Sequence, residues 1–253
     1  MGCAKPTALG VAVEVTLPDG VQVFTDLPLA IDPDEVLRFQ GYKKGVDVPT
    51  PDVRVLFDDA LAEGVRLMAP RAVVRWLPVR GRGTDTIDVA GERLTIPATA
   101  ERWGEVEHVA AGVVTIGDAL ERRVADLWAS RELPLASMLD SVGSGAVESL
   151  AEYVNDVLCA QGLAAGLAVT NRISPGYADW EVAEQYALFR LCAGAPVGVT
   201  LNAECFMTPA KSISLLAGAG VRARVDHYFS QCARCWMRDC AYRRAPVRRS
   251  VRR

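Results

Sequence analysis

The hexapeptide RISPGY at residues 172–177 holds the residues with the clearest chemical potential. Pro175 fixes one backbone dihedral and Gly176 frees the next, so the segment should form a tight turn with exposed amides. Arg172 offers a planar guanidinium for a carboxylate, and Tyr177 offers a flat ring with a hydroxyl. The set is suited to an amino-acid-like ligand with an aromatic or cationic group. The alternative interpretation is an ordinary strand-to-helix turn in which Arg172 pairs with a surface acid.

A second chemical cluster is the C-x2-C-x4-C group formed by Cys232, Cys235 and Cys240. Three soft ligands at this spacing can close around one metal ion, with His227 or Cys205 as candidates for the fourth. We expect a structural metal here, because the segment has too few apolar residues to anchor itself. Reduced, unmetallated thiols are the alternative.

The elements on either side should position the hexapeptide. A strand is predicted at residues 166–170 and a helix at residues 182–191, so the motif links the two. A long helix is predicted from residue 134 to about residue 158. Gly143 and Gly145 within it indicate either a kink or the close approach of another element.

The remaining pattern predicts an α+β fold with a mostly antiparallel sheet, because strands and helices alternate without a regular βαβ rhythm. Its predicted elements are a hairpin at 11–24, helices at 32–41, 51–68 and 118–127, and strands at 72–79, 86–90, 91–96, 106–116 and 197–201.

Composition limits the functional class. The chain has 253 residues, half of them hydrophobic, and a formal charge of −3, so the body should not attract nucleic acid or anionic membranes by charge. It contains no apolar run near the roughly 20 residues that span a bilayer and no secretory signal, which predicts a cytoplasmic protein.

The arginine-rich residues 243–253 predict a solvated tail. The sequence contains no Gly-rich phosphate loop and no Ser-His-Asp pattern, which argues against a nucleotide hydrolase or a protease.

Several ordered segments resemble the activation domain of cobalamin-dependent methionine synthase, in the form of its free-standing members. RISPGYADW at 172–180 is similar to that family's R-x-x-P-G-Y signature. Further similar segments are DEVLRFQGY at 34–42, VTIG at 114–117, LDSVGSGAVE at 139–148, LNAECF at 201–206, MTPAKSIS at 207–214, and the ending with the cysteine cluster, Tyr242 and Arg243.

This resemblance implies a bent antiparallel sheet flanked by helices, with S-adenosylmethionine in a surface groove. Arg172 would bind the methionyl carboxylate, the backbone around Ser174 and Pro175 would meet the adenosine, and Glu148 would hold polar groups of the ligand. Tyr177 would lie between the ligand and the corrin of a cobalamin domain. The implied ligand-binding residues are Glu148, Arg172, Ser174, Pro175, Gly176 and Tyr177.

The sequence departs from the family in one loop. Asn202, Ala203 and Glu204 stand where relatives commonly have Thr-Glu-Ser, so one acid is lost and another is gained at the next position. The change either rearranges the charge around the ligand or is drift on the surface.

Two chemical functions are compatible with these residues. In the first, the protein presents S-adenosylmethionine for reductive remethylation of a cobalamin protein, which must be a separate chain because no cobalamin-binding segment is recognised. In the second, it is a cofactor-independent cyclase that forms 1-aminocyclopropane-1-carboxylate and methylthioadenosine, with Glu204 or Tyr177 as the catalytic base and Arg172 neutralising the carboxylate. A ligand-binding module without chemistry is the third interpretation.

The expected organisation has three parts. Residues 1–30 form an N-terminal hairpin extension, residues 31–231 an S-adenosylmethionine-binding domain, and residues 232–253 a cysteine-rich and arginine-rich tail.

Overall fold

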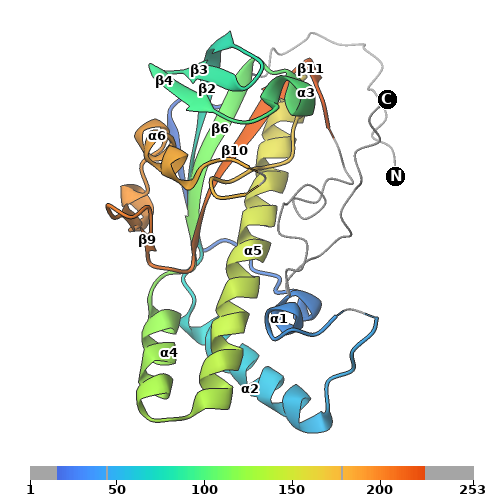
Figure 1. The fold of residues 1–253 in the computed structure, drawn as a ribbon, viewed down its shortest axis with the longest axis vertical. Coiled ribbons are helices and arrows are strands. Elements are labelled where there is room, and N and C mark those ends of the chain that lie inside the picture. The colour runs from blue at the N-terminus through green and yellow to red at the C-terminus, as the bar shows by residue number, and fades with distance from the viewer. Residues whose placement is uncertain (1–15, 44, 178, 226–253) are drawn as a thin grey trace.

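A computed structural model describes residues 16–43, 45–177 and 179–225 (Figure 1). Its centre is a seven-stranded sheet in the order β4-β3-β2-β6-β10-β7, with β1 paired to β2, and every described pair is antiparallel. The predicted α+β class with a mostly antiparallel sheet is confirmed. The strands are β1 Val21–Thr25, β2 Arg71–Arg82, β3 Thr86–Val89, β4 Glu92–Thr95, β6 His108–Thr115, β7 Ala168–Val169 and β10 Ser212–Gly220.

Side-chain alternation along the strands divides the core between the two faces of the sheet. Ala72 and Val74 of β2 point into one core, whereas Val73 between them points into the other. In Figure 1 the helices α5 and α6 lie on opposite sides of the sheet. The first core is covered by α1 Pro33–Phe39, α2 Pro51–Leu67, α4 Ala119–Ala129 and α5 Leu133–Ala164, and the second by α6 Gln185–Leu191 and the 3-10 helix η2 Ala195–Val197.

The long helix α5 is continuous, and its glycines allow close packing. A Cβ at Gly145 would lie 2.8 Å from Cγ2 of Val36 in α1, and one at Gly143 would lie 2.8 Å from Cδ2 of Leu120 in α4. Close approach, not a kink, therefore explains these glycines. The helix also runs to Ala164, beyond the predicted end near residue 158.

The predictions for two other segments need correction. The strand predicted at 197–201 is replaced by η2 and the short strand β8 Thr200–Leu201, which pairs with β9 Met207–Thr208. Gly198 separates them with a left-handed φ of 77° that a strand does not accept. The helix predicted at 182–191 begins as the 3-10 helix η1 Val182–Glu184 before α6.

Strand β10 was not predicted, although it pairs with both β6 and β7. Its second half reads AGAG, which lacks the β-branched and aromatic residues typical of strands. The small residues are required there, because a Cβ at Gly218 would lie 2.8 Å from Cε3 of Trp103. Trp103 ends helix α3 Thr99–Trp103, and β5 Gly104–Glu105 then pairs with β11 Arg222–Ala223.

The predicted N-terminal hairpin is described only in part. Its second half forms β1, which pairs with β2, whereas most of its first half lies outside the described residues. The three-part organisation stays a prediction. No helix in the described part of the chain is long and apolar enough to cross a membrane.

Candidate functional site

The RISPGY segment leaves β7 and crosses the edge of the sheet beside β10. Ile173 exchanges two backbone hydrogen bonds of 2.9 Å with Leu216 of β10, which fixes the segment against the sheet. The chain then turns at Gly176, where φ is 87°. The predicted tight turn is present.

The amides of this turn are engaged, contrary to the expectation that they would be exposed. The Gly176 amide donates to the Trp180 carbonyl at 2.7 Å, and the Tyr177 amide donates to the Ser174 carbonyl at 3.3 Å. The first bond joins the turn to the buried Trp180, and the second closes the turn itself. Any ligand contact with these two residues would therefore use carbonyl groups or side chains.

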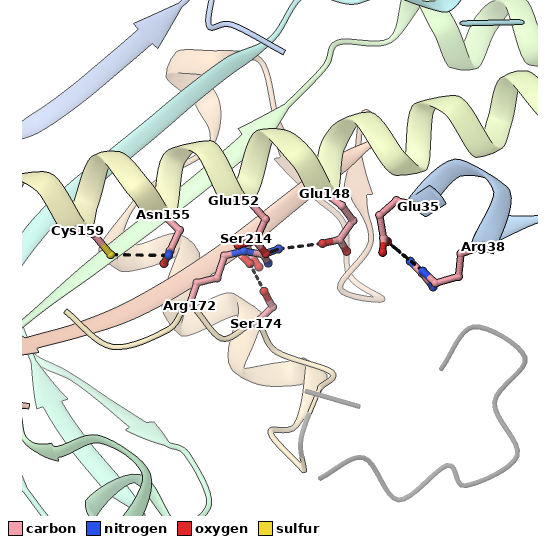
Figure 2. A network of polar contacts seen from close by, with 9 residues as sticks. All are labelled: Glu35, Arg38, Glu148, Glu152, Asn155, Cys159, Arg172, Ser174 and Ser214. Atoms are coloured by element: carbon pink, nitrogen blue, oxygen red, sulfur yellow. Dashed lines mark hydrogen bonds and ion pairs between the residues drawn. The ribbon is translucent and has the colours of Figure 1, made fainter. Parts of the chain in front are cut away.

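Arg172 is the centre of the site and lies against α5. Its side chain is 8% exposed, and its Nη2 atom contacts Oε2 of Glu148 at 2.9 Å and Oε1 of Glu152 at 2.7 Å (Figure 2). The acids are four residues apart, which places them on the same face of the helix. The structure therefore joins two of the predicted residues, Arg172 and Glu148, and adds Glu152.

The electrostatics of the cluster keep the guanidinium charged. Burial alone would lower the pKa of Arg172, but the carboxylates of Glu152 and Glu148 outweigh it and raise that pKa. The Nε atom of Arg172 is buried and has no hydrogen-bond partner among the residues that the structure describes. Two carboxylates against one guanidinium leave the cluster with one formal negative charge in excess.

A relay of three hydrogen bonds, two of them buried, runs from the turn to the loop at 202–206. The Ser174 hydroxyl donates to the Ser214 carbonyl at 2.7 Å, and the Ser214 hydroxyl donates to Oε1 of Gln185 at 3.1 Å. The Gln185 amide then donates to the Cys205 carbonyl at 3.0 Å. The Ser174 hydroxyl is therefore occupied by the protein itself, and Gln185 ties the two loops together.

The other predicted ligand residues differ in exposure. Pro175 is buried beside Ser174, Gly176 is exposed, and the Tyr177 side chain is 54% exposed. The role expected for Tyr177 beside a ligand and a corrin stays a prediction.

Glu204 lies on the far side of the relay from Arg172. It is exposed, and its backbone amide bonds to the Asn202 side chain at 3.0 Å. No hydrogen bond or ion pair joins Glu204 to Arg172 directly. The pKa of Tyr186 is raised, chiefly by burial and to a smaller extent by the neighbouring Cys205 and Glu204. The negative charge of Glu204 therefore favours the protonated form of Tyr186.

Sequence reasoning missed Glu152, Ser214 and Gln185. Glu152 carried a usable signal, because it lies one helical turn after Glu148 and a helix presents both on one face. Ser214 and Gln185 carried none, since their partners are distant in the sequence.

The predicted metal ligands Cys232, Cys235 and Cys240 lie outside the described residues, as does His227. Cys205 is described and half-buried. Within the residues that the structure describes, no group of three or more His, Cys, Asp or Glu side chains is placed to hold a metal ion.

Comparison with known proteins identifies the fold. Neither a family model nor a curated protein matches the chain in sequence. Among solved structures, the crystal structure of the MetH reactivation domain bound to AdoHcy matches with a TM-score of 0.62 and 16% identity, over 88% of this chain and 86% of that one. The chain therefore has the fold of a methionine synthase reactivation domain.

Proposed function

We propose that this protein binds S-adenosylmethionine between α5 and the 172–177 turn. The observation that carries the proposal is the buried Arg172 held between Glu148 and Glu152. A guanidinium is suited to the methionyl carboxylate, and carboxylates are suited to the ammonium and sulfonium groups. The similar solved domain holds AdoHcy, a ligand with the same adenosyl and amino-acid parts.

The charge of the cluster supports this ligand. S-adenosylmethionine carries one carboxylate and two cationic groups, so its net charge is +1. The cluster carries one negative charge in excess, and the two would neutralise one another. A dicarboxylate or a phosphate would add to the negative charge and is disfavoured.

In the function proposed first, the bound molecule is a methyl donor for a corrinoid held by another chain. The residues of this chain then have only to orient the sulfonium toward that partner, which lowers the entropic part of the barrier without a base. The Tyr177 ring is exposed at the turn, where such an interface would form.

The cyclase is the second candidate, and the hydrogen-bond relay is the observation that favours it. Because Gln185 and Ser214 tie the 202–206 loop to the turn that carries Arg172, the position of Glu204 is coupled to the site. A base is essential for this reaction, since the α-proton of an amino acid is a very weak acid. Glu204→Gln or Tyr177→Phe should then lower the turnover about 100-fold while binding is kept.

Calorimetry with S-adenosylmethionine tests the binding proposal. We expect Arg172→Ala to weaken binding about tenfold or more, because a charge-assisted contact to the carboxylate is lost. Arg190→Ala is the matched control, since Arg190 also pairs with an acid, Glu92, but on the surface of β4. Equal affinity in the Arg172 variant and the parent would remove Arg172 from the site.

Product analysis then separates the two reactions. Formation of both 1-aminocyclopropane-1-carboxylate and methylthioadenosine from S-adenosylmethionine alone would establish the cyclase, because loss of homoserine lactone also releases methylthioadenosine. Absence of that product, together with methylation of an added reduced corrinoid protein, would establish the methyl-donor role.

A further inference from the structure

The second acid beside Arg172 gives the site a means of selecting its ligand. We propose that Glu152 receives the α-ammonium group of the ligand and makes the site specific for α-amino acids over nucleosides that lack this group. The inference rests on the proposed function and deepens it.

The covalent structure of the ligand requires neighbouring receptors. In an α-amino acid the carboxylate and the ammonium are bonded to the same carbon, so the groups that bind them must lie within a few ångströms of one another. Both acids satisfy this condition, because each contacts Nη2 of Arg172, at 2.7 Å for Glu152 and 2.9 Å for Glu148.

Exposure decides which acid receives the ammonium. The side chain of Glu152 is 61% exposed, compared with 22% for Glu148. The Glu152 carboxylate is largely in contact with water, so it loses less on leaving Arg172 for a ligand than the more buried Glu148 would. Glu148 is more buried and stays with the guanidinium, so the buried charge of Arg172 is never left unpaired.

The guanidinium also has a free donor for the incoming carboxylate. Nε and Nη2 share one edge of the group, and Nε is buried with no hydrogen-bond partner in the described part of the chain. A ligand carboxylate on this edge would replace Glu152 at Nη2 and satisfy Nε, which is the bidentate geometry that arginine favours. The displaced Glu152 would then face the ammonium on the adjacent carbon.

Calorimetry with three probes tests the role of Glu152 in the full chain. The probes are S-adenosylmethionine, its analogue with hydrogen in place of the α-ammonium, and methylthioadenosine. We expect Glu152→Gln to weaken binding of S-adenosylmethionine about tenfold or more and not to weaken binding of the other two, since the variant also removes the carboxylate that the analogue must displace from Arg172. Asp156→Asn, which removes the same charge from an exposed position one turn further along α5, should change none of the three.

The outcomes separate this inference from the function on which it rests. If the parent binds S-adenosylmethionine and Glu152→Gln binds it equally well, the inference is wrong and the proposed function stands. A uniform loss for all three probes would assign Glu152 a structural role and also overturn the inference. A parent protein that does not bind S-adenosylmethionine would overturn both.

Discussion

Replacement of Gln185 by leucine should destabilise the protein through the relay. Gln185 is buried at the start of α6, where it accepts from the Ser214 hydroxyl and donates to the Cys205 carbonyl. Leucine would leave the buried Ser214 hydroxyl without an acceptor, at about 1–3 kcal/mol, and would remove a bond of about 1 kcal/mol to Cys205. We therefore expect Gln185→Leu to lower the free energy of unfolding by about 2–4 kcal/mol.

Urea denaturation of a double-mutant cycle measures this value. Ser214→Ala alone should also destabilise the fold, because it leaves Oε1 of Gln185 without its donor. The double variant removes both polar groups, so its loss should be smaller than the sum of the single losses. Strict additivity, or a loss below about 0.5 kcal/mol for Gln185→Leu, would refute the reasoning, since surface changes have effects of that size.

Two further predictions concern cysteines. Burial raises the pKa of Cys192 to about 12 from an ordinary value of 9.0, so the folded protein binds this proton more tightly than the unfolded chain. The stability from this group should be complete below pH 9 and fall as the pH rises toward 12, and Cys192→Ala should remove that part of the slope in unfolding measurements. An unchanged slope in the variant would refute the assignment. For Cys232, Cys235 and Cys240, elemental analysis of protein purified without chelator should find zinc or iron, and Cys235→Ser should lower the melting temperature. No metal together with unchanged melting would leave ordinary thiols.

Local signals in the sequence determined the helices and most strands. Asp32 caps α1 with its side chain, and Pro51 begins α2, because these residues act on the backbone next to them. The turn at Gly176 was predicted for the same reason, since a left-handed φ there favours glycine. Arg172 was recognised from its type and its place in the motif, and Glu148 from the resemblance.

Tertiary structure decided what depends on contacts between distant residues. Strand β10 could not be predicted, because its glycine and alanine residues are explained by the ring of Trp103 packed against it, not by their own propensity. Glu152 became part of the site only when α5 was seen beside the turn, 20 residues away in the sequence. Gln185 and Ser214 are 29 residues apart, and their hydrogen bond exists only because α6 packs on the sheet. The sequence thus predicted Arg172 and Glu148 as candidates for binding a charged ligand, whereas the packing of α5 beside the turn added Glu152 and decided which side chains pair.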